Sequence, residues 1–294
     1  MSKVTLSKDD IEIEVWPLGA RLNSVRYMGS RNFVDGAVDG TEARGAKLNH
    51  GSVAGPVANR IARGTFEIEG KTFALERDEN GKTTLHSGSH STRDAIWDVI
   101  AQSDQEVCFE LAIPDHKDGF PGNRVIKAIY TLHPKGFDLR FEAKTDSATL
   151  MNLALHPYWT LATDDRDALK LAVYADHYLP VDDDKIPTGE VADVEEDFDL
   201  RAPKVPSPKI DHNFCLSGWM QHAAQLESDT YRLNVATDAP GIQIYTGKPF
   251  GIAIEPQHWP DAPHHSHFPS ILLHPGETYQ QLTQYRLAKI GEGG

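Results

Sequence analysis

The chain has 294 residues, with 29 Lys and Arg against 43 Asp and Glu, which gives a formal net charge of −14. Nucleic acid and anionic membranes are poor partners for such a chain, because phosphate binding needs a basic surface. With 39% hydrophobic and 24% charged residues, the composition is typical of a soluble globular protein with a sizeable core. Length alone leaves the number of domains open.

The amino-terminal segment lacks the apolar stretch of a signal peptide, and no later segment approaches membrane-spanning length. We therefore expect a cytoplasmic protein. Cys108 and Cys215 each lie between apolar neighbours, so we expect buried thiols rather than a disulfide.

Apolar residues alternate with polar ones along much of the chain, a pattern typical of half-buried strands. Clear runs occur, in chain order, at 11–15, 66–68, 73–75, 137–141 and 242–244. Turn sequences separate them at Glu69-Gly70, Asn80-Gly81, 133–136 and the proline-dense stretch 203–208. The best candidate for a short helix is 220–226. We predict an all-β fold, an antiparallel sandwich or barrel, in one continuous domain over 1–294.

Common motifs for nucleotide and hydrolase chemistry are missing from the sequence. The segment 241–249 superficially resembles a phosphate-binding loop, but it has one residue too many between its glycines and ends in Pro249. Neither a Gly-x-Ser-x-Gly elbow nor a His-Glu-x-x-His motif is found. Acidic runs at 164–165, 182–184 and 193–199 offer oxygen ligands for calcium, but they are more typical of solvated loops.

A histidine-rich segment near the carboxyl terminus leaves a metal-dependent enzyme open as an alternative. Its histidines are His258, His264, His265 and His267. Prolines within the segment disfavour a regular helix or a central strand, so a structured surface loop is the simpler interpretation.

Six places set chemically capable side chains between strand-like residues or beside turns. They are Asn59-Arg60, His86, His156 with Tyr158 and Trp159, Asp211, Gln243 and Glu255. Each alone is explained as well by a structural role. A sandwich, however, can bring side chains from several strands onto one concave face, where this set suits acid–base work on a hydroxylated neutral ligand. Glu255 ends an apolar run. At the end of a strand it would either be partly buried, which raises its pKa toward that of a useful base, or point to water, which composition alone favours.

Read in order, segments spanning nearly the whole chain resemble the aldose 1-epimerase (galactose mutarotase) family. The matching segments are Gly19-Ala20-Arg21-Leu22, 57–64, Leu85-His86-Ser87-Gly88, 118–123, His156-Pro157-Tyr158-Trp159, 175–182 with 186–189, 211–214, 241–247, Glu255-Pro256-Gln257-His258, 260–263, 268–270 and 275–277. The resemblance implies a large antiparallel β-sandwich, the galactose mutarotase-like supersandwich, with a monosaccharide held on its concave face. It also implies that the histidine-rich segment is a family loop, and that neither a cofactor nor a metal takes part. We expect a monomer or a weak homodimer.

The resemblance further places the acid at His156 and the base at Glu255. It assigns sugar contacts to Asn59, Arg60, His86, Tyr158, Asp211 and Gln243. Glu255 would take the proton of the C1 hydroxyl while His156 protonates the ring oxygen. Because His156 would start protonated, we expect a carboxylate such as Asp211 to hold its pKa up. Arg60 and His86 are expected to make charge-assisted hydrogen bonds to the sugar.

Five residues depart from the family pattern, and we expect them to border the sugar and to bear on its identity. They are Thr83, Thr84, Ser87, Leu155 and Thr160. Two alternatives stay open: a non-catalytic sugar-binding or sensing protein on the same fold, and a mutarotase for a phosphorylated or sulfonated sugar. Arginines available for such an anion are Arg21, Arg26, Arg60 and Arg63.

Overall fold

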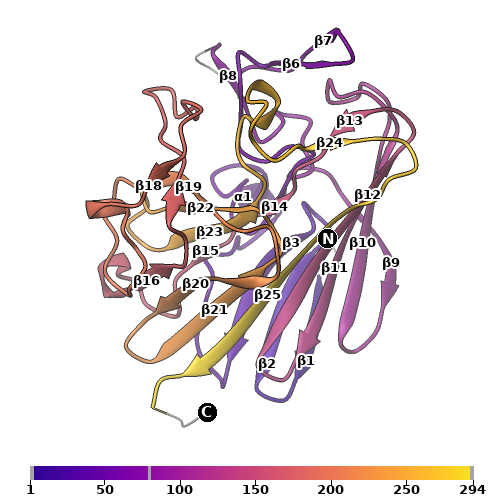
Figure 1. Cartoon of the computed structure of the whole chain (residues 1–294). Coiled ribbons are helices and arrows are strands. Elements are labelled where there is room, and N and C mark those ends of the chain that lie inside the picture. The colour runs from indigo at the N-terminus through magenta and orange to yellow at the C-terminus, as the bar shows by residue number, and fades with distance from the viewer. Residues whose placement is uncertain (1–2, 79–80, 292–294) are drawn as a thin grey trace.

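The computed structural model describes residues 3–78 and 81–291, and antiparallel strands dominate it (Figure 1). Its largest sheet has eight strands. In spatial order they are β16 (Lys170–Val173), β20 (Gln221–Glu227), β21 (Tyr231–Thr237), β25 (Tyr279–Lys289), β12 (Gly136–Thr145), β11 (Arg124–His133), β10 (Glu106–Ile113) and β9 (Asp98–Gln102).

A second sheet of six strands carries much of the candidate site. Its spatial order is β15 (Tyr158–Trp159), β23 (Ile252–Gln257), β22 (Gly241–Tyr245), β19 (Asp211–Cys215), β17 (His177–Tyr178) and β18 (Ala192–Asp193). Because neighbouring strands in the sheet come from distant parts of the chain, side chains far apart in sequence meet on one face.

Smaller sheets complete the fold. A three-stranded sheet contains β1 (Val4–Lys8), β2 (Ile11–Trp16) and β3 (Arg21–Tyr27), and the two-stranded pairs are β4 (Val53–Ala54) with β14 (Ala154–Leu155), β5 (Arg60–Ala62) with β8 (Thr83–Leu85), β6 (Thr65–Ile68) with β7 (Lys71–Ala74), and β13 (Thr149–Leu150) with β24 (Leu272–Leu273). Helical segments are short: α1 (Gly40–Arg44) and the 3-10 turns η1 (Arg166–Ala168), η2 (Glu196–Phe198) and η3 (Ala262–His264).

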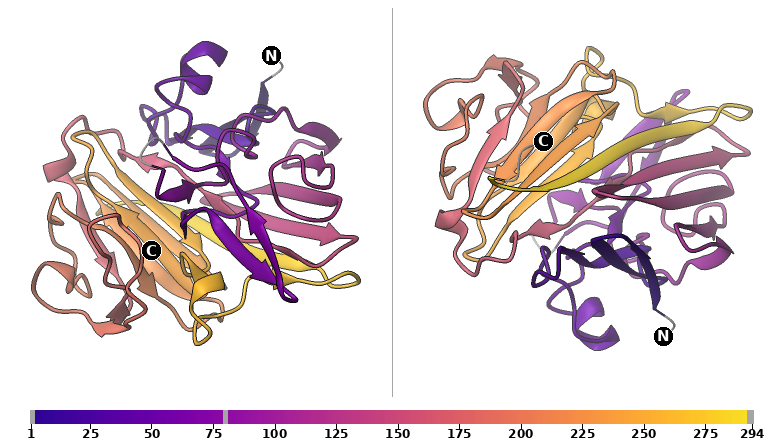
Figure 2. Two further views of the ribbon diagram at one scale, coloured as in Figure 1. Left: turned by 90° about the horizontal axis from the view of Figure 1, so that it is seen from above. Right: turned by 90° about the horizontal axis from the view of Figure 1, so that it is seen from below.

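One large hydrophobic cluster joins these sheets into a sandwich. It takes fully buried side chains from the three-, eight- and six-stranded sheets, for example Leu22 of β3, Phe137 of β12 and Ile244 of β22. Views from above and below show the amino-terminal strands on one side of the long strands (Figure 2), where β1 contacts β11. The predicted all-β antiparallel sandwich is therefore confirmed.

Predicted strand runs and turns mostly coincide with the observed elements. In β12, Phe137, Leu139 and Phe141 point into the core while the residues between them are less buried, as period-two alternation requires. Glu69-Gly70 joins β6 to β7 with positive φ angles of 51° and 76°, and 133–136 joins β11 to β12. Of the predicted Asn80-Gly81 turn, Asn80 lies outside the described residues.

The predicted helix at 220–226 is wrong. This segment forms β20, which pairs with β16 on one side and β21 on the other. Its buried residues Ala223, Ala224 and Leu226 pack into the sandwich core, and sheet pairing on both edges outweighs the local helical pattern. Both cysteines are free thiols; Cys108 is buried and Cys215 half-buried, and burial raises the pKa of Cys215 to about 12.

Candidate active site

Four neighbouring strands of the six-stranded sheet form one wall of a cleft. In β22, Ile242 and Ile244 face the core, so Gln243 and Tyr245 face the other side. The register pairs Gln243 with Glu255 of β23 and Tyr245 with Asp211 of β19. Strand alternation and register thus place amide, phenol and carboxylate groups side by side.

The second wall comes from β5, β8 and the turn after β8. Asn59 and His86 both adopt positive φ angles, 63° and 49°. Their backbones are locked together: the His86 N–H donates to the Asn59 carbonyl at 2.8 Å, and the Asn59 N–H donates to His86 Nδ1 at 3.0 Å. Since Nδ1 accepts, the proton of a neutral His86 ring lies on Nε2, which is then available to donate to a ligand.

The cleft between these walls has a volume of about 250 Å³. All eight residues assigned from the resemblance line it: Asn59, Arg60, His86, His156, Tyr158, Asp211, Gln243 and Glu255. Trp159, considered from the sequence as a stacking surface, is fully buried against Tyr285 and fills the core.

His156 and Glu255 are both buried, 5% and 2% exposed, with His156 Nε2 3.3 Å from Glu255 Oε1. Burial raises the pKa of Glu255 well above its usual value, and the charge of Asp211 adds to the effect. Burial lowers the pKa of His156 to about 3. Glu255 Oε2 and His156 Nδ1 are buried and have no hydrogen-bond partner within the described part of the chain.

The expectation that Asp211 holds up the pKa of His156 is wrong. Asp211 instead accepts a hydrogen bond from Gln243 Nε2 at 2.7 Å and lies 3.9 Å from Arg60 Nη1. The carboxylate that contacts His156 belongs to Glu255, and burial of the ring outweighs its attraction.

His86 does not supply the charge expected of it either. Burial, together with the positive charges of Arg93 and Arg60, lowers its pKa well below the usual value, so the ring is neutral. Among the two residues predicted to make charge-assisted bonds, only Arg60 carries a charge. His86 offers an uncharged Nε2–H donor instead.

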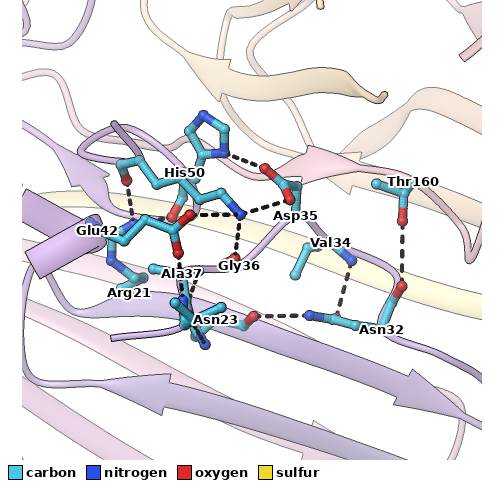
Figure 3. A network of polar contacts seen from close by, with 12 residues as sticks. Arg21, Asn23, Asn32, Val34, Asp35, Gly36, Ala37, Glu42, His50 and Thr160 are labelled. Carbon is cyan, nitrogen blue, oxygen red and sulfur yellow. Dashed lines mark hydrogen bonds and ion pairs between the residues drawn. The ribbon is translucent and has the colours of Figure 1, made fainter. Parts of the chain in front are cut away.

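A polar network around Asp35 and His50 lies next to the cleft residue Tyr158, and Figure 3 shows the contacts within the network. His50 Nδ1 lies 2.7 Å from Asp35 Oδ2, and Lys47 donates to the other oxygen of Asp35 at 3.0 Å. The ring of His50 packs on Tyr158 with centroids 4.3 Å apart, and Tyr158 packs on His156 at 5.2 Å. The network thereby holds an aromatic stack that ends at the candidate acid.

The segment that carries His50 is also hydrogen-bonded to the backbone of His156. The Gly51 N–H donates to the His156 carbonyl at 2.8 Å, and the His156 N–H donates to the Ser52 carbonyl at 3.0 Å. Arg21 is fully buried and donates to the carbonyls of the segment's earlier residues, Ala43, Lys47 and Leu48, and to that of His50.

The five departures from the family pattern do not line the cleft, so the expectation that they border the sugar is wrong. Thr83 and Thr84 donate to Asp78 and to the Glu76 carbonyl, and Ser87 bonds the backbone of Val57. Leu155 lies in the core, and Thr160 donates to the Asn32 carbonyl. These side chains stabilise turns and packing around the site.

The histidine-rich loop packs against β5 and is hydrogen-bonded to its backbone through Asp261. His264 and His265 both face Asp261, with nitrogen-to-oxygen distances of 2.6 Å and 3.4 Å. Asp261 in turn accepts a hydrogen bond from the Ala62 N–H at 2.8 Å and donates its own N–H to the Arg60 carbonyl. The loop therefore helps to position Arg60.

Four lining residues were not singled out from the sequence: Asn49, Leu85, Tyr245 and Lys248. Tyr245 was detectable, because it lies two residues after Gln243 on the same strand and therefore on the same face. Lys248 lies in the segment that superficially resembles a phosphate-binding loop. Asn49, whose Oδ1 accepts from Arg93 at 2.6 Å, carries no local signal.

Fold and cleft together define a β-sandwich protein with a buried His156–Glu255 pair in a cleft lined largely by hydrogen-bonding side chains. The sequence matches the aldose 1-epimerase family over residues 2–286. It is 31% identical to galactose mutarotase of Bos taurus, covering 98% of this chain and 94% of that protein, and 30% identical to aldose 1-epimerase of Escherichia coli, covering 80% and 79%. The crystal structure of an aldose epimerase homologue from C. elegans superposes with a TM-score of 0.93 at 24% identity, covering 99% of both chains.

The chain belongs to the aldose 1-epimerase family, an isomerase family. The predicted family and fold are thereby confirmed. Within the described residues, no helix is long and apolar enough to cross a membrane.

Proposed function

We propose that this chain is a cofactor-independent mutarotase, which interconverts the α and β anomers of a free aldose in this cleft. One observation carries the proposal. His156 Nε2 and Glu255 Oε1 lie 3.3 Å apart, both buried, in a cleft otherwise lined by hydrogen-bonding groups suited to sugar hydroxyls.

In the proposed reaction, Glu255 removes the proton of the C1 hydroxyl while His156 donates a proton to the ring oxygen. The bond between C1 and the ring oxygen breaks, and the open-chain aldehyde forms. Rotation about C1–C2 presents the other face of the aldehyde. The ring hydroxyl then attacks C1, returning its proton to His156, and Glu255 returns a proton to the carbonyl oxygen.

The two residues hold one proton between them throughout this cycle. Before ring opening, His156 has the proton and both groups are charged; after ring opening, Glu255 has it and both are neutral. Burial favours the neutral arrangement, since it raises the pKa of Glu255 and lowers that of His156. Burial therefore favours the state after ring opening, and in the empty cleft it likewise places the proton on Glu255, so the proposed cycle starts once the bound sugar has shifted this proton to His156.

The other lining residues would orient the sugar. His86 would donate a hydrogen bond through Nε2. Arg60 would supply a fixed positive charge that stabilises the negative charge developing on the ring oxygen as its bond to C1 breaks. Asp211, held by Gln243 and Arg60, accepts hydrogen bonds from hydroxyls. Asn59 uses its side-chain oxygen for the Arg60 N–H at 2.9 Å, which leaves its amide nitrogen to donate.

Polarimetry on freshly dissolved α-D-galactose and α-D-glucose tests the proposal. Wild type should accelerate mutarotation over the spontaneous rate, and Glu255→Gln or His156→Asn should each lower kcat by about 10²–10⁴-fold. Glu67→Gln, at an exposed glutamate of β6, is the matched control and should behave as wild type. Near-normal turnover by Glu255→Gln would remove Glu255 as the base.

Other outcomes separate the alternatives. Sugar binding in calorimetry without any acceleration would indicate a non-catalytic binding protein. Acceleration only with phosphorylated or sulfonated sugars would indicate an anion-specific epimerase; of the arginines considered for that role, Arg60 lines the cleft, whereas Arg21 is buried behind it and Arg26 pairs with Glu12. The cytoplasmic location and the monomer or weak homodimer stay predictions.

A further inference from the structure

Lys248 is a positive charge in the cleft that the proposed reaction does not use. It lies in the connection between β22 and β23, lines the same cleft as Glu255 and Gln243, and is half-buried. Within 3–78 and 81–291, it forms no ion pair and no hydrogen bond through its side chain. Its ammonium group is therefore available to pair with a charged group of a ligand in the cleft.

The connection that carries Lys248 is anchored on both sides of it. Before it, the Thr246 hydroxyl donates to the Ser207 carbonyl at 2.7 Å, and the Thr246 carbonyl accepts from Arg166 Nη1 at 3.2 Å. After it, the Pro249 carbonyl accepts from the Arg166 N–H at 3.3 Å. Lys248 is therefore presented from a fixed backbone position.

The charges in the cleft do not balance without a ligand. Arg60 faces Asp211, so these two offset one another. The His156–Glu255 pair holds one proton and has no net charge in either arrangement. Lys248 is left as one unmatched positive charge, which one negative charge on a ligand would offset.

The register of the two strands places Lys248 away from the reacting carbon. The connection that carries Lys248 joins β22 to β23 just beyond the paired residues Tyr245 and Ala253. Glu255 pairs with Gln243, two residues further from this connection along each strand. Two residues along a strand span about 7 Å. When C1 lies at Glu255, the lysine approaches the sugar from the end nearer Tyr245.

We propose that Lys248 adapts the cleft to an aldose that carries a carboxylate remote from C1, namely a hexuronic acid. This inference rests on the proposed mutarotase function and names the substrate class of the same site. A single ammonium group matches a carboxylate of charge −1. A phosphate group carries about −1.5 to −2 and would leave part of its charge uncompensated.

Polarimetry with two matched sugar pairs tests the inference: galactose against galacturonate, and glucose against glucuronate. In wild type, kcat/KM should be higher for the uronate in at least one pair. Lys248→Met should lower the uronate-to-neutral ratio of kcat/KM by about tenfold, the loss expected for one charge-assisted hydrogen bond. Lys248→Arg, which keeps the charge, should retain most of the preference.

Lys170→Met removes an exposed lysine of β16 on the other sheet and should leave the ratio unchanged. An unchanged ratio in Lys248→Met, with galactose still turned over, would overturn the substrate class and leave the mutarotase function standing. A higher kcat/KM for galactose 6-phosphate than for galacturonate would also overturn the inference that Lys248 selects a carboxylate. Absence of turnover with every sugar would overturn the mutarotase function, and the inference with it.

Discussion

Glu255, the proposed base, lowers the stability of the fold at neutral pH. Burial raises the pKa of its carboxyl group well above that of an unfolded glutamate, about 4.3. Between these two pKa values, the folded chain keeps a proton that the unfolded chain has released. The free energy of unfolding therefore falls as pH rises through this range.

Replacing this carboxyl group should stabilise the protein while abolishing turnover. We expect Glu255→Gln to raise Tm at pH 8 by on the order of a few degrees, because the neutral amide has no charged form to bury. The difference should shrink as pH approaches about 4.3. Thermal unfolding at several pH values measures it, with Glu67→Gln as the exposed control; a gap that does not change with pH would contradict the explanation.

At the scale of one side chain, sequence reasoning left the environment of Glu255 open and failed for His156. An apolar run ending in a carboxylate allowed either a buried group with a raised pKa or one that points to water, and the structure buries it. For His156, the nearest carboxylate and the extent of burial depend on how β14, β15 and β23 meet. No local pattern carries that information.

At the scale of elements, the hydrogen bonds from Arg21 to the backbone of residues 43–50, before β4, link the stability of the fold to the position of His156. Its guanidinium donates to the carbonyls of Ala43, Leu48 and His50, among others, and burial lowers its pKa to about 10 while its charge remains. Gly51 and Ser52, which follow directly, bond the backbone of His156. The sequence placed Arg21 in a family motif without showing that it serves this segment.

Arg21→Met should lower the free energy of unfolding by about 3–5 kcal/mol, because it leaves several buried carbonyls without donors. It should also lower kcat more than it raises KM, since the segment positions His156. Urea unfolding and steady-state polarimetry measure the two effects. Arg26→Met is the matched control on the same strand: its exposed pair with Glu12 should contribute about 1 kcal/mol or less. An equal loss in the free energy of unfolding in the two variants would show that the buried hydrogen bonds of Arg21 do not hold this segment in place.

At the scale of the whole molecule, buried histidines make the fold sensitive to acid. Burial lowers the pKa of four of them: His86, His156, His212 and His258. An unfolded histidine has a pKa of about 6.5. As pH falls from 6.5 toward 4, the unfolded chain takes up protons that the folded chain does not, so the free energy of unfolding falls.

We therefore expect the urea midpoint to fall steeply between pH 7 and pH 5. His258, whose pKa is lowered to about 4, lies outside the cleft and provides the test. His258→Gln should reduce the pH dependence by about one proton, or about 1.4 kcal/mol per pH unit. An unchanged slope in this variant would show that other groups cause the acid sensitivity.

The sequence by itself determined the all-β class, most strand positions and the family, and through the family it led to His156 and Glu255 as the proposed acid and base. These follow from period-two alternation, turn residues and motifs spread along the chain, which are all local signals. The tertiary structure decided that 220–226 is a strand, that Asp211 serves Gln243 and Arg60 rather than His156, and that the five departures lie outside the cleft. It also brought Lys248 into the cleft, because burial, charge pairing and the lining of a site depend on which distant strands become neighbours.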